Sequence, residues 1–319
     1  MTFEDLDLIE PICKALVQEG YTTPTPIQSE AIPIVSQGYD LLGCAQTGTG
    51  KTAAFSIPII QRLYLQKKKG YKRGIKALIL TPTRELAIQI GESFAAYGRF
   101  AGLRHTVIFG GVGQKPQTEA LERGIDILIA TPGRLLDLIG QGFIHLDTLE
   151  YFVLDEADRM LDMGFFDDVT KILDRIKNRT NLGLFSATIS QEVMTVSWMY
   201  QRDEVEITVA PTEESKPDID QYSITVPRLE KEEAMLRILR SGALERVIVF
   251  CNTKVMCQRL SDDLRRAGIR ADCLHGDIKQ STREKTMADF RHGKLPVLIA
   301  TDVASRGIDV DDVDGVINY

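Results

Sequence analysis

Short apolar segments alternate with stretches of helical spacing along this 319-residue chain, and the alternation strongly constrains the fold. The apolar segments are unbroken and rich in Val, Ile and Leu, as expected of strands that are buried on both faces of a sheet. Because a helical stretch follows most of them, neighbouring strands can be joined by crossovers and run parallel. The pattern therefore predicts an α/β fold in which helices cover both faces of parallel sheets.

The predicted strands form two series, separated by the polar segment PTEESKPDID that begins at residue 211. The first series is DLLGCA at 40–45, KALILTP at 76–82, HTVIFGG at 105–111, DILIATP at 126–132, YFVLDE at 151–156, LGLFSAT at 182–188 and EVEITV at 204–209. The second series is QYSITV at 221–226, RVIVFCN at 246–252, ADCLHG at 271–276, PVLIATD at 296–302 and GVINY at 315–319. A proline-containing polar segment without apolar period is typical of a linker. We therefore predict two tandem lobes, residues 1–210 and 219–319, with a linker at 211–218.

Composition narrows the class of protein. No apolar run approaches the roughly 20 residues that span a bilayer, and the acidic N-terminus lacks a secretory signal, so we expect a cytoplasmic protein without membrane contact. The five cysteines are scattered and form no C-x-x-C pair, which argues against a disulfide framework and a zinc site. The net charge of -7 counts mildly against nucleic acid, although a local strip of Lys and Arg can suffice. The basic run KKKGYKR at 67–73 is interpreted as a solvated loop, with an accessory phosphate contact as the alternative.

The motif AQTGTGKT at 45–52 lies between the first predicted strand and a helix that we expect to begin near Lys51. It fits the phosphate-binding loop G-x-x-x-x-G-K-[ST] except for Ala45, a position that needs only an ordinary φ angle and a small side chain. Backbone N–H groups and the helix dipole can hold phosphates here, Lys51 can reach the β- and γ-phosphates, and the Thr52 hydroxyl can bind Mg²⁺. The predicted nucleotide-binding residues of this loop are Ala45, Gln46, Thr47, Gly48, Thr49, Gly50, Lys51 and Thr52.

A second motif, DEAD at 155–158, follows the apolar strand YFVL. At the carboxyl end of a buried strand, Asp155 can hold Mg²⁺ through water, and Glu156 can orient and deprotonate an attacking water. Either motif alone has a plainer interpretation, a glycine-rich turn with a chance lysine or a solvated acidic run. Their combination favours hydrolysis of a nucleoside triphosphate, with Glu156, Lys51 and Asp155 as the catalytic candidates.

With AQTGTGKT and DEAD together, the sequence resembles the DEAD-box ATP-dependent RNA helicases, in a bacterial-type core, along essentially the whole chain. Alanine is the usual first residue of the loop in that family. The resemblance implies two RecA-like lobes, with ATP and Mg²⁺ between them and RNA across the facing surface. It also implies that GYTTPTPIQ at 20–28 is an adenine-recognising Q motif, in which the Gln28 amide pairs with adenine and Phe3 stacks on the ring. Without the resemblance, Phe3 and Gln28 would be interpreted as a core aromatic and a surface amide.

The resemblance further assigns residues to RNA binding and to coupling. In the first lobe, the segments PTRELA, GG and TPGR give the RNA-binding residues Pro82, Thr83, Arg84, Gly110, Gly111, Thr131, Pro132, Gly133 and Arg134. In the second lobe, Gln280, Arg283 and Thr301 would contact RNA, whereas Gly307 and Asp309 would reach the ATP. In SAT at 186–188, Ser186 and Thr188 would hydrogen-bond Asp158 and couple hydrolysis to strand separation. From the residues alone, the Pro-Thr and Pro-Gly segments would be capped helix starts.

One motif of that family, H-R-x-G-R-x-x-R after a segment like GVINY, does not occur in these 319 residues. Because arginine fingers contribute roughly 10³ to 10⁵ in rate in related enzymes, we expect a second lobe that is incomplete at its C-terminus and a chain that hydrolyses ATP poorly. The main prediction is a monomeric ATP-dependent RNA helicase that unwinds short duplexes with little sequence preference. The alternatives are an ATP-gated RNA-binding clamp without useful turnover and a DNA helicase of the same architecture.

Overall fold

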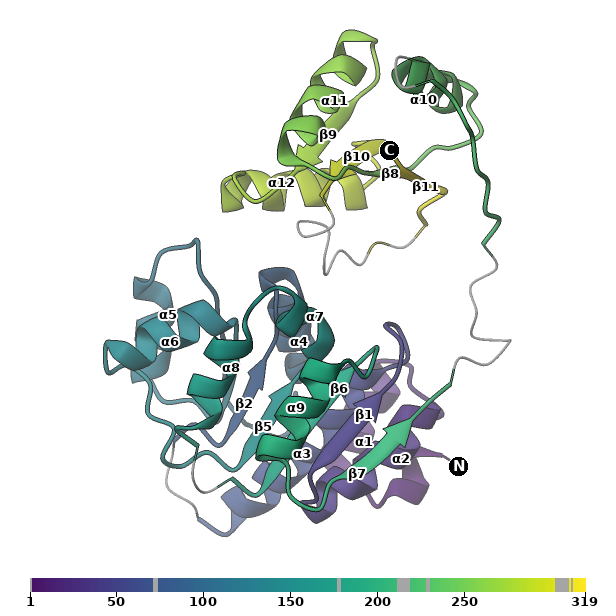
Figure 1. The fold of residues 1–319 in the computed structure, drawn as a ribbon. Coiled ribbons are helices and arrows are strands. Elements are labelled where there is room, and N and C mark those ends of the chain that lie inside the picture. The colour runs from purple at the N-terminus through teal and green to yellow at the C-terminus, as the bar shows by residue number, and fades with distance from the viewer. Residues whose placement is uncertain are drawn as a thin grey trace. The chain divides into compact units, whose positions relative to one another are not determined.

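The computed structural model describes residues 2–70, 74–176, 179–210, 219–227, 230–301, 310 and 312–319. The chain divides into two compact units, Met1–Pro217 and Asp218–Tyr319, which we call the first and second lobes. Each lobe contains its own parallel sheet with helices packed against it (Figure 1). The predicted fold class, two parallel-sheet α/β units in tandem, is confirmed.

The first lobe contains a seven-stranded parallel sheet of order β3-β4-β2-β5-β6-β1-β7. Its strands are β1 (Leu41–Cys44), β2 (Ala77–Leu80), β3 (His105–Ile108), β4 (Ile127–Ala130), β5 (Tyr151–Leu154), β6 (Asn181–Ser186) and β7 (Val205–Thr208). Each of the seven predicted segments contains one of these strands, except that β6 begins one residue before its segment. Because β6 lies between β5 and β1, the segments that follow these three strands meet at the carboxyl edge of the sheet.

Helices cover both faces of this sheet (Figure 1). They are the 3₁₀ helix η1 (Phe3–Leu6) and the α-helices α1 (Glu10–Gln18), α2 (Pro26–Gln37), α3 (Lys51–Lys68), α4 (Arg84–Tyr97), α5 (Lys115–Glu122), α6 (Pro132–Gly140), α7 (Ala157–Asp162), α8 (Phe166–Leu173) and α9 (Gln191–Tyr200). Successive strand residues point to opposite faces, so Val153 joins the hydrophobic cluster of α2, α3 and α4, whereas Phe152 and Leu154 join that of α6 to α9. Among the described residues, no helix is both long enough and apolar enough to cross a membrane.

The second lobe contains a four-stranded parallel sheet of order β11-β8-β10-β9. Its elements are α10 (Lys231–Arg240), β8 (Val247–Phe250), α11 (Lys254–Arg266), β9 (Ala271–Leu274), α12 (Gln280–Arg291), β10 (Val297–Ala300) and β11 (Gly315–Asn318). The predicted strand at 221–226 is wrong, because none of the described strands pairs with it and its Tyr222 and Ile224 side chains are exposed. Alternating apolar residues favour a strand only where a neighbouring strand supplies the hydrogen-bonded ladder.

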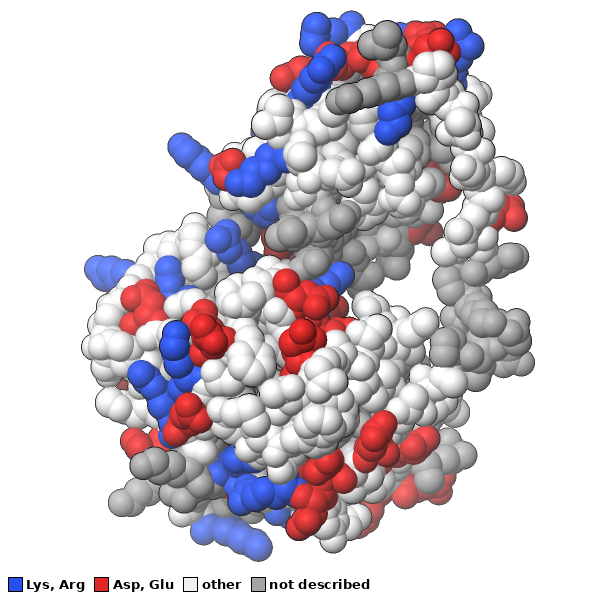
Figure 2. Space-filling model, in the orientation of Figure 1, with Lys and Arg blue, Asp and Glu red and all other residues white. Residues whose placement is uncertain are grey.

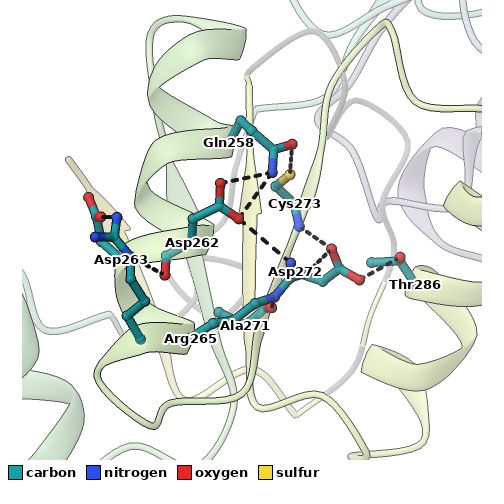
Figure 3. A network of polar contacts seen from close by, with 9 residues as sticks. Gln258, Asp262, Asp263, Arg265, Ala271, Asp272, Cys273 and Thr286 are labelled. Carbon is teal, nitrogen blue, oxygen red and sulfur yellow. Dashed lines mark hydrogen bonds and ion pairs between the residues drawn. The ribbon is translucent and has the colours of Figure 1, made fainter.

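A polar network joins α11, the edge strand β9 and α12 in the second lobe (Figure 3). The Asp272 carboxylate accepts hydrogen bonds from the Cys273 N–H (2.9 Å), from Arg265 Nη2 (2.7 Å) and from Thr286 Oγ1 (3.3 Å). An edge strand exposes unpaired backbone groups, and this aspartate satisfies one of them within the lobe. The network therefore has a structural explanation in the fold of the second lobe.

Candidate active site

The loop at 45–52 begins as β1 ends and leads directly into α3, which starts at Lys51 as predicted. Gly48 (φ +83°) and Gly50 (φ +87°) have left-handed backbone conformations that side chains with a Cβ rarely adopt. A Cβ on Gly50 would also clash with the Gln28 amide. The buried Ala45 donates its N–H to the Ser186 carbonyl (3.0 Å), so the first position of the loop extends the strand pairing of β1 and β6.

Lys51 is buried at the start of α3, and its Nζ donates to the Ala45 carbonyl at 2.6 Å. This bond closes the loop on itself, and a second bond from Thr49 Oγ1 to the Gln46 carbonyl (2.7 Å) tightens it. The hydrogen-bond partner of Lys51 is a neutral carbonyl, so the charge of this buried ammonium group is balanced only partly and through space, by the nearby Asp155. Together with the glycines and the helix N-terminus, this charge fits the phosphates of a nucleotide.

Asp155 and Glu156 follow β5 at the same edge of the sheet, and both are buried. Burial raises the pKa of the Asp155 carboxyl to about 7, Lys51 opposes the rise, and the neighbouring Glu156 adds to it. A carboxylate that is so strongly desolvated gains from a nearby cation, and oxygen ligands suit Mg²⁺. Within the described part of the chain, no three His, Cys, Asp or Glu side chains form a metal-binding group. Asp155 and Thr52 are the residues that would hold a magnesium ion here, and Mg²⁺ usually keeps several water ligands beside one or two carboxylates.

Glu156 makes a contact that the sequence analysis missed. Its Oε2 accepts a hydrogen bond from Arg159 Nη1 at 2.5 Å, an ion pair between residues three positions apart. The backbone of Glu156 has φ +51° and ψ +50°, the left-handed conformation, directly before α7. The opposite charges at a spacing of three, DEADR, were the available sequence signal.

The predicted hydrogen bonds between SAT and Asp158 are present. Asp158 Oδ2 accepts from the Thr188 N–H (2.9 Å) and Oγ1 (2.7 Å), and the Asp158 N–H donates to Ser186 Oγ (3.2 Å). Burial raises the pKa of Asp158, but these hydrogen bonds and one from the Arg159 N–H outweigh burial and leave the pKa below its usual range. Hydrogen bonds therefore join the start of α7 to the end of β6 and to Thr188, and they favour an ionised Asp158.

The structure places the Q-motif residues against the loop and in the core. The buried Gln28 amide accepts from the Thr25 N–H (3.0 Å) and donates to the Gly50 carbonyl (3.2 Å), so it is not a surface amide. Thr25 Oγ1 also donates to the Thr49 carbonyl (2.8 Å), which ties the start of α2 to the phosphate-binding loop. Phe3 is buried and packs edge to face on Tyr21, with 6.4 Å between ring centroids, which is the position of a core aromatic.

The first-lobe candidates for RNA binding follow β2, β3 and β4, three neighbouring strands. Arg84 packs against Gly111, where φ is +82° and an added Cβ would clash with the guanidinium group. Arg134 donates to the Val112 carbonyl (3.2 Å), and its buried Nη1 has no hydrogen-bond partner among the described residues. The segment around Gly111 therefore contacts both arginines.

The remaining candidates of this group lie beside the two arginines, mostly at helix starts. Thr83 caps α4 by accepting a hydrogen bond from the Leu86 N–H (3.3 Å), and Thr131 and Pro132 begin α6. On the face in Figure 2, Lys and Arg side chains alternate with Asp and Glu and form no continuous basic field among the described residues.

In the second lobe, the structure describes only some of the predicted residues. Arg283 is buried in α12, and Thr301 follows β10 and donates its N–H to the Leu274 carbonyl (3.3 Å). The Gln280 side chain, Gly307 and Asp309 lie outside the described part of the chain.

Comparisons with known proteins find related helicases along the whole chain. Residues 25–196 match the model of the DEAD/DEAH box helicase family, and residues 230–319 match the helicase conserved C-terminal domain. The chain is 40% identical to the ATP-dependent RNA helicase DeaD of Escherichia coli (strain K12), covering 100% of this chain and 50% of the relative. It is also 40% identical to DEAD-box ATP-dependent RNA helicase 30 of Arabidopsis thaliana, covering 99% and 54%. The chain thus spans about half the length of these curated relatives.

Two of the solved structures that are similar to this chain match it over its whole length. A DEAD box protein from the hyperthermophile Methanococcus jannaschii is 39% identical with a TM-score of 0.59, and the match covers 85% of that protein. The second, S. cerevisiae dbp5 bound to gle1 and ip6, is 29% identical with a TM-score of 0.73 and 79% coverage. The phosphate-binding loop, the DEAD and SAT segments and these matches lead to one conclusion: the chain belongs to the DEAD/DEAH box helicase family.

Proposed function

We propose that the protein is an ATP-dependent RNA helicase, which binds ATP with Mg²⁺ and RNA and opens short duplexes locally. The observation that carries this proposal is the hydrogen-bonded junction of three segments at one sheet edge: the loop at 45–52, DEAD at 155–158 and SAT at 186–188. In this proposal residues 1–210 and 219–319 act as two helicase lobes, and the protein works as a cytoplasmic monomer. The similarity to ATP-dependent RNA helicases along the whole chain supports the assignment.

The chain's own residues would divide the work as follows. Lys51 would exchange the Ala45 carbonyl for phosphate oxygens, and Thr52 and Asp155 would hold the metal ion. Glu156 would accept a proton from the attacking water at a carboxylate oxygen. Bound ATP with Mg²⁺ supplies the phosphoanhydride bond whose hydrolysis drives the cycle.

Coupling to RNA would use the contacts at the edge of the sheet. Asp158 shares hydrogen bonds with Thr188 and Ser186, so a change at the DEAD segment reaches the residues after β6 directly. Arg84 and Arg134 would grip the sugar-phosphate chain, which gives weak sequence readout. The second-lobe residues Arg283 and Thr301 would complete the RNA contacts, with Gln280, while Gly307 and Asp309 would contact ATP.

The test is steady-state ATP hydrolysis by the 319-residue chain, with and without single-stranded RNA, beside a Glu156→Gln variant. We expect RNA to stimulate a turnover that is low, in line with the expectation from the sequence, and the variant to lose it while still binding ATP. Nucleotide-dependent RNA binding without any turnover would support an ATP-gated clamp instead. Competition between RNA and DNA strands of the same sequence should favour RNA, because 2′-hydroxyl contacts distinguish them, and equal binding would support a DNA helicase.

A further inference from the structure

We infer that Arg159 is a positioning residue for Glu156, which holds the carboxylate of the proposed general base in a single orientation. The inference rests on the proposed function, because it concerns the residue that would accept the proton from water. Arg159 is not among the residues assigned to catalysis, to nucleotide binding or to RNA binding. Its role is to act through Glu156 rather than on the nucleotide.

Arg159 and Glu156 form a short ion pair in which the carboxylate is largely buried. Arg159 Nη1 lies 2.5 Å from Glu156 Oε2, and the two side chains are 34% and 11% exposed. Within the described part of the chain, Oε2 alone of the two carboxylate oxygens receives a hydrogen bond. One oxygen of Glu156 is therefore fixed by a charged donor, and the other remains available to a water molecule.

The backbone around the pair is also fixed. Glu156 is held in the left-handed conformation, and its N–H donates to Asp155 Oδ1 at 3.1 Å. The Arg159 N–H donates to Asp158 Oδ1 at 2.9 Å, and the next residue, Met160, is fully buried. Because both backbones are anchored, the ion pair restrains the remaining freedom, which is the rotation of the Glu156 side chain.

The surrounding charges explain why a cation is needed at this position. Three carboxyl groups, Asp155, Glu156 and Asp158, gather at the ends of β5 and α7, and Lys51 faces Asp155 from α3. Without Arg159, repulsion from the two flanking aspartates would favour rotation of the Glu156 carboxylate toward solvent. Misplacing a reacting group by about 1 Å can cost roughly 100-fold in rate, so the orientation of this side chain matters.

The first experiment separates positioning from a general effect of charge on nucleotide binding. We expect Arg159→Ala to lower kcat for RNA-stimulated ATP hydrolysis by about 10- to 100-fold. The affinity for a fluorescent ATP analogue should stay within about twofold of wild type, since binding does not use the orientation of Glu156. Arg159→Lys keeps a charged donor and should restore part of kcat. The matched control is Lys171→Ala, which removes another ion pair of spacing three, with Asp168 on α8 at 3.8 Å.

The second experiment needs no nucleotide. A double-mutant cycle of Glu156→Gln and Arg159→Ala, followed by urea unfolding of the ligand-free chain, measures the coupling between the two side chains. We expect the shift in the unfolding midpoint caused by Arg159→Ala to shrink clearly once Glu156 is replaced. Additive shifts would show that the pair does not restrain Glu156.

The outcomes also separate this inference from the proposed function. A wild-type chain that binds neither ATP nor RNA would contradict the proposed function. A chain that binds both without turnover would leave the double-mutant cycle, which needs no nucleotide, to decide the inference by itself. An active wild type with unchanged kcat in Arg159→Ala would overturn the inference alone. Weaker binding of the ATP analogue at unchanged kcat would assign Arg159 to charge compensation and would likewise overturn positioning.

Discussion

The two lobes share an architecture but differ in how they bury polar groups. In the first lobe, the ends of β1 and β5 place the charged side chains Lys51, Asp155 and Glu156 in a buried environment. In the second lobe, the ion pair Lys254–Asp277 (2.7 Å) is exposed, with side-chain exposures of 55% and 68%. A parallel sheet therefore does not by itself create a reactive site. Arg283 on α12 is buried in the second lobe as well, so the difference lies in the acids: Asp155 and Glu156 are buried at the carboxyl edge of the first sheet, whereas Asp277 is exposed.

The hydrophobic cores of the two lobes also differ in size. Both faces of the first-lobe sheet are covered by extensive hydrophobic clusters, whereas the described clusters of the second lobe are smaller. Burying a charge costs free energy, and a large apolar core can offset that cost. We therefore expect the first lobe to be the more stable of the two.

The largest effect should come from removing one core aromatic in each lobe. Phe185 and Phe290 are both fully buried, and truncating either to alanine should cost about 3–5 kcal/mol of unfolding free energy. Phe290→Ala should abolish hydrogen-exchange protection in the second lobe and leave that of the first lobe nearly intact, as followed by peptide mass spectrometry. Equal loss of protection in both lobes would show that they unfold as one cooperative unit and would break the comparison.

The second effect concerns buried and exposed lysines. Lys51→Ala should weaken ATP binding by about 10- to 100-fold, because a hydrogen bond to a charged group contributes about 1.5–3 kcal/mol. The matched change in the second lobe, Lys254→Ala, removes an exposed pair and should leave ATP affinity within about twofold of wild type. A fluorescence titration with an ATP analogue measures both. Equal losses in the two variants would contradict the assignment of phosphate binding to Lys51.

Sequence reasoning predicted the strands and helix starts well where several signals agreed. The start of α3 at Lys51 followed from the loop motif, and the hydrogen bonds of Asp158 with Thr188 and Ser186 followed from the family resemblance. The strand predicted at 221–226 was wrong because alternating apolar residues indicate a strand only locally. Whether such a segment joins a sheet depends on a partner strand that is distant in sequence.

Side-chain contacts across the site were less accessible to sequence reasoning. The amide of Gln28 could be expected to recognise a base, but its hydrogen bond to the Gly50 carbonyl depends on how α2 packs beside the loop. The ion pair of Glu156 with Arg159 required the left-handed turn before α7. Such contacts follow from backbone geometry that residue spacing alone does not give.

The third effect is a difference in pH dependence between two aspartates. Burial raises the pKa of Asp155 to about 7, so the folded state binds this proton more tightly than the unfolded state. Stability contributed by the protonated group is therefore lost as the pH rises from about 4 to about 7. Asp155→Asn should raise the unfolding free energy by roughly 1–3 kcal/mol at pH 8, and the gain should vanish toward pH 4.

The control for this prediction lies in the second lobe. The hydrogen bond from Lys254 lowers the pKa of Asp277, so its small contribution to stability is present at neutral pH and lost as the pH falls. Asp277→Asn should therefore change stability slightly and with the opposite sign at pH 8. Urea unfolding at several pH values measures both variants, and a gain for Asp155→Asn that is independent of pH would contradict the raised pKa.

The smallest effect compares one ion pair from each lobe. On the surface of α10, Arg237 Nε lies 3.0 Å from Glu233 Oε1, and the two side chains are 78% and 58% exposed. In the first lobe, Lys76 Nζ lies 2.9 Å from Glu150 Oε1, and these side chains are only 12% and 25% exposed. A double-mutant cycle should give a coupling of about 0.3–0.5 kcal/mol for the helical pair, which is the usual value for exposed side chains four residues apart.

The pair in the first lobe should couple more strongly, at about 1 kcal/mol, because partial burial lowers the dielectric screening between the charges. Raising the salt concentration from about 0.1 M to 1 M shortens the Debye length from about 10 Å to 3 Å, which should remove most of the coupling on α10 and spare most of that between Lys76 and Glu150. Equal couplings with equal salt dependence would mean that the lobes do not differ in electrostatic environment away from the active site. The difference would then be confined to the carboxyl edge of the first sheet, where Lys51, Asp155 and Glu156 lie.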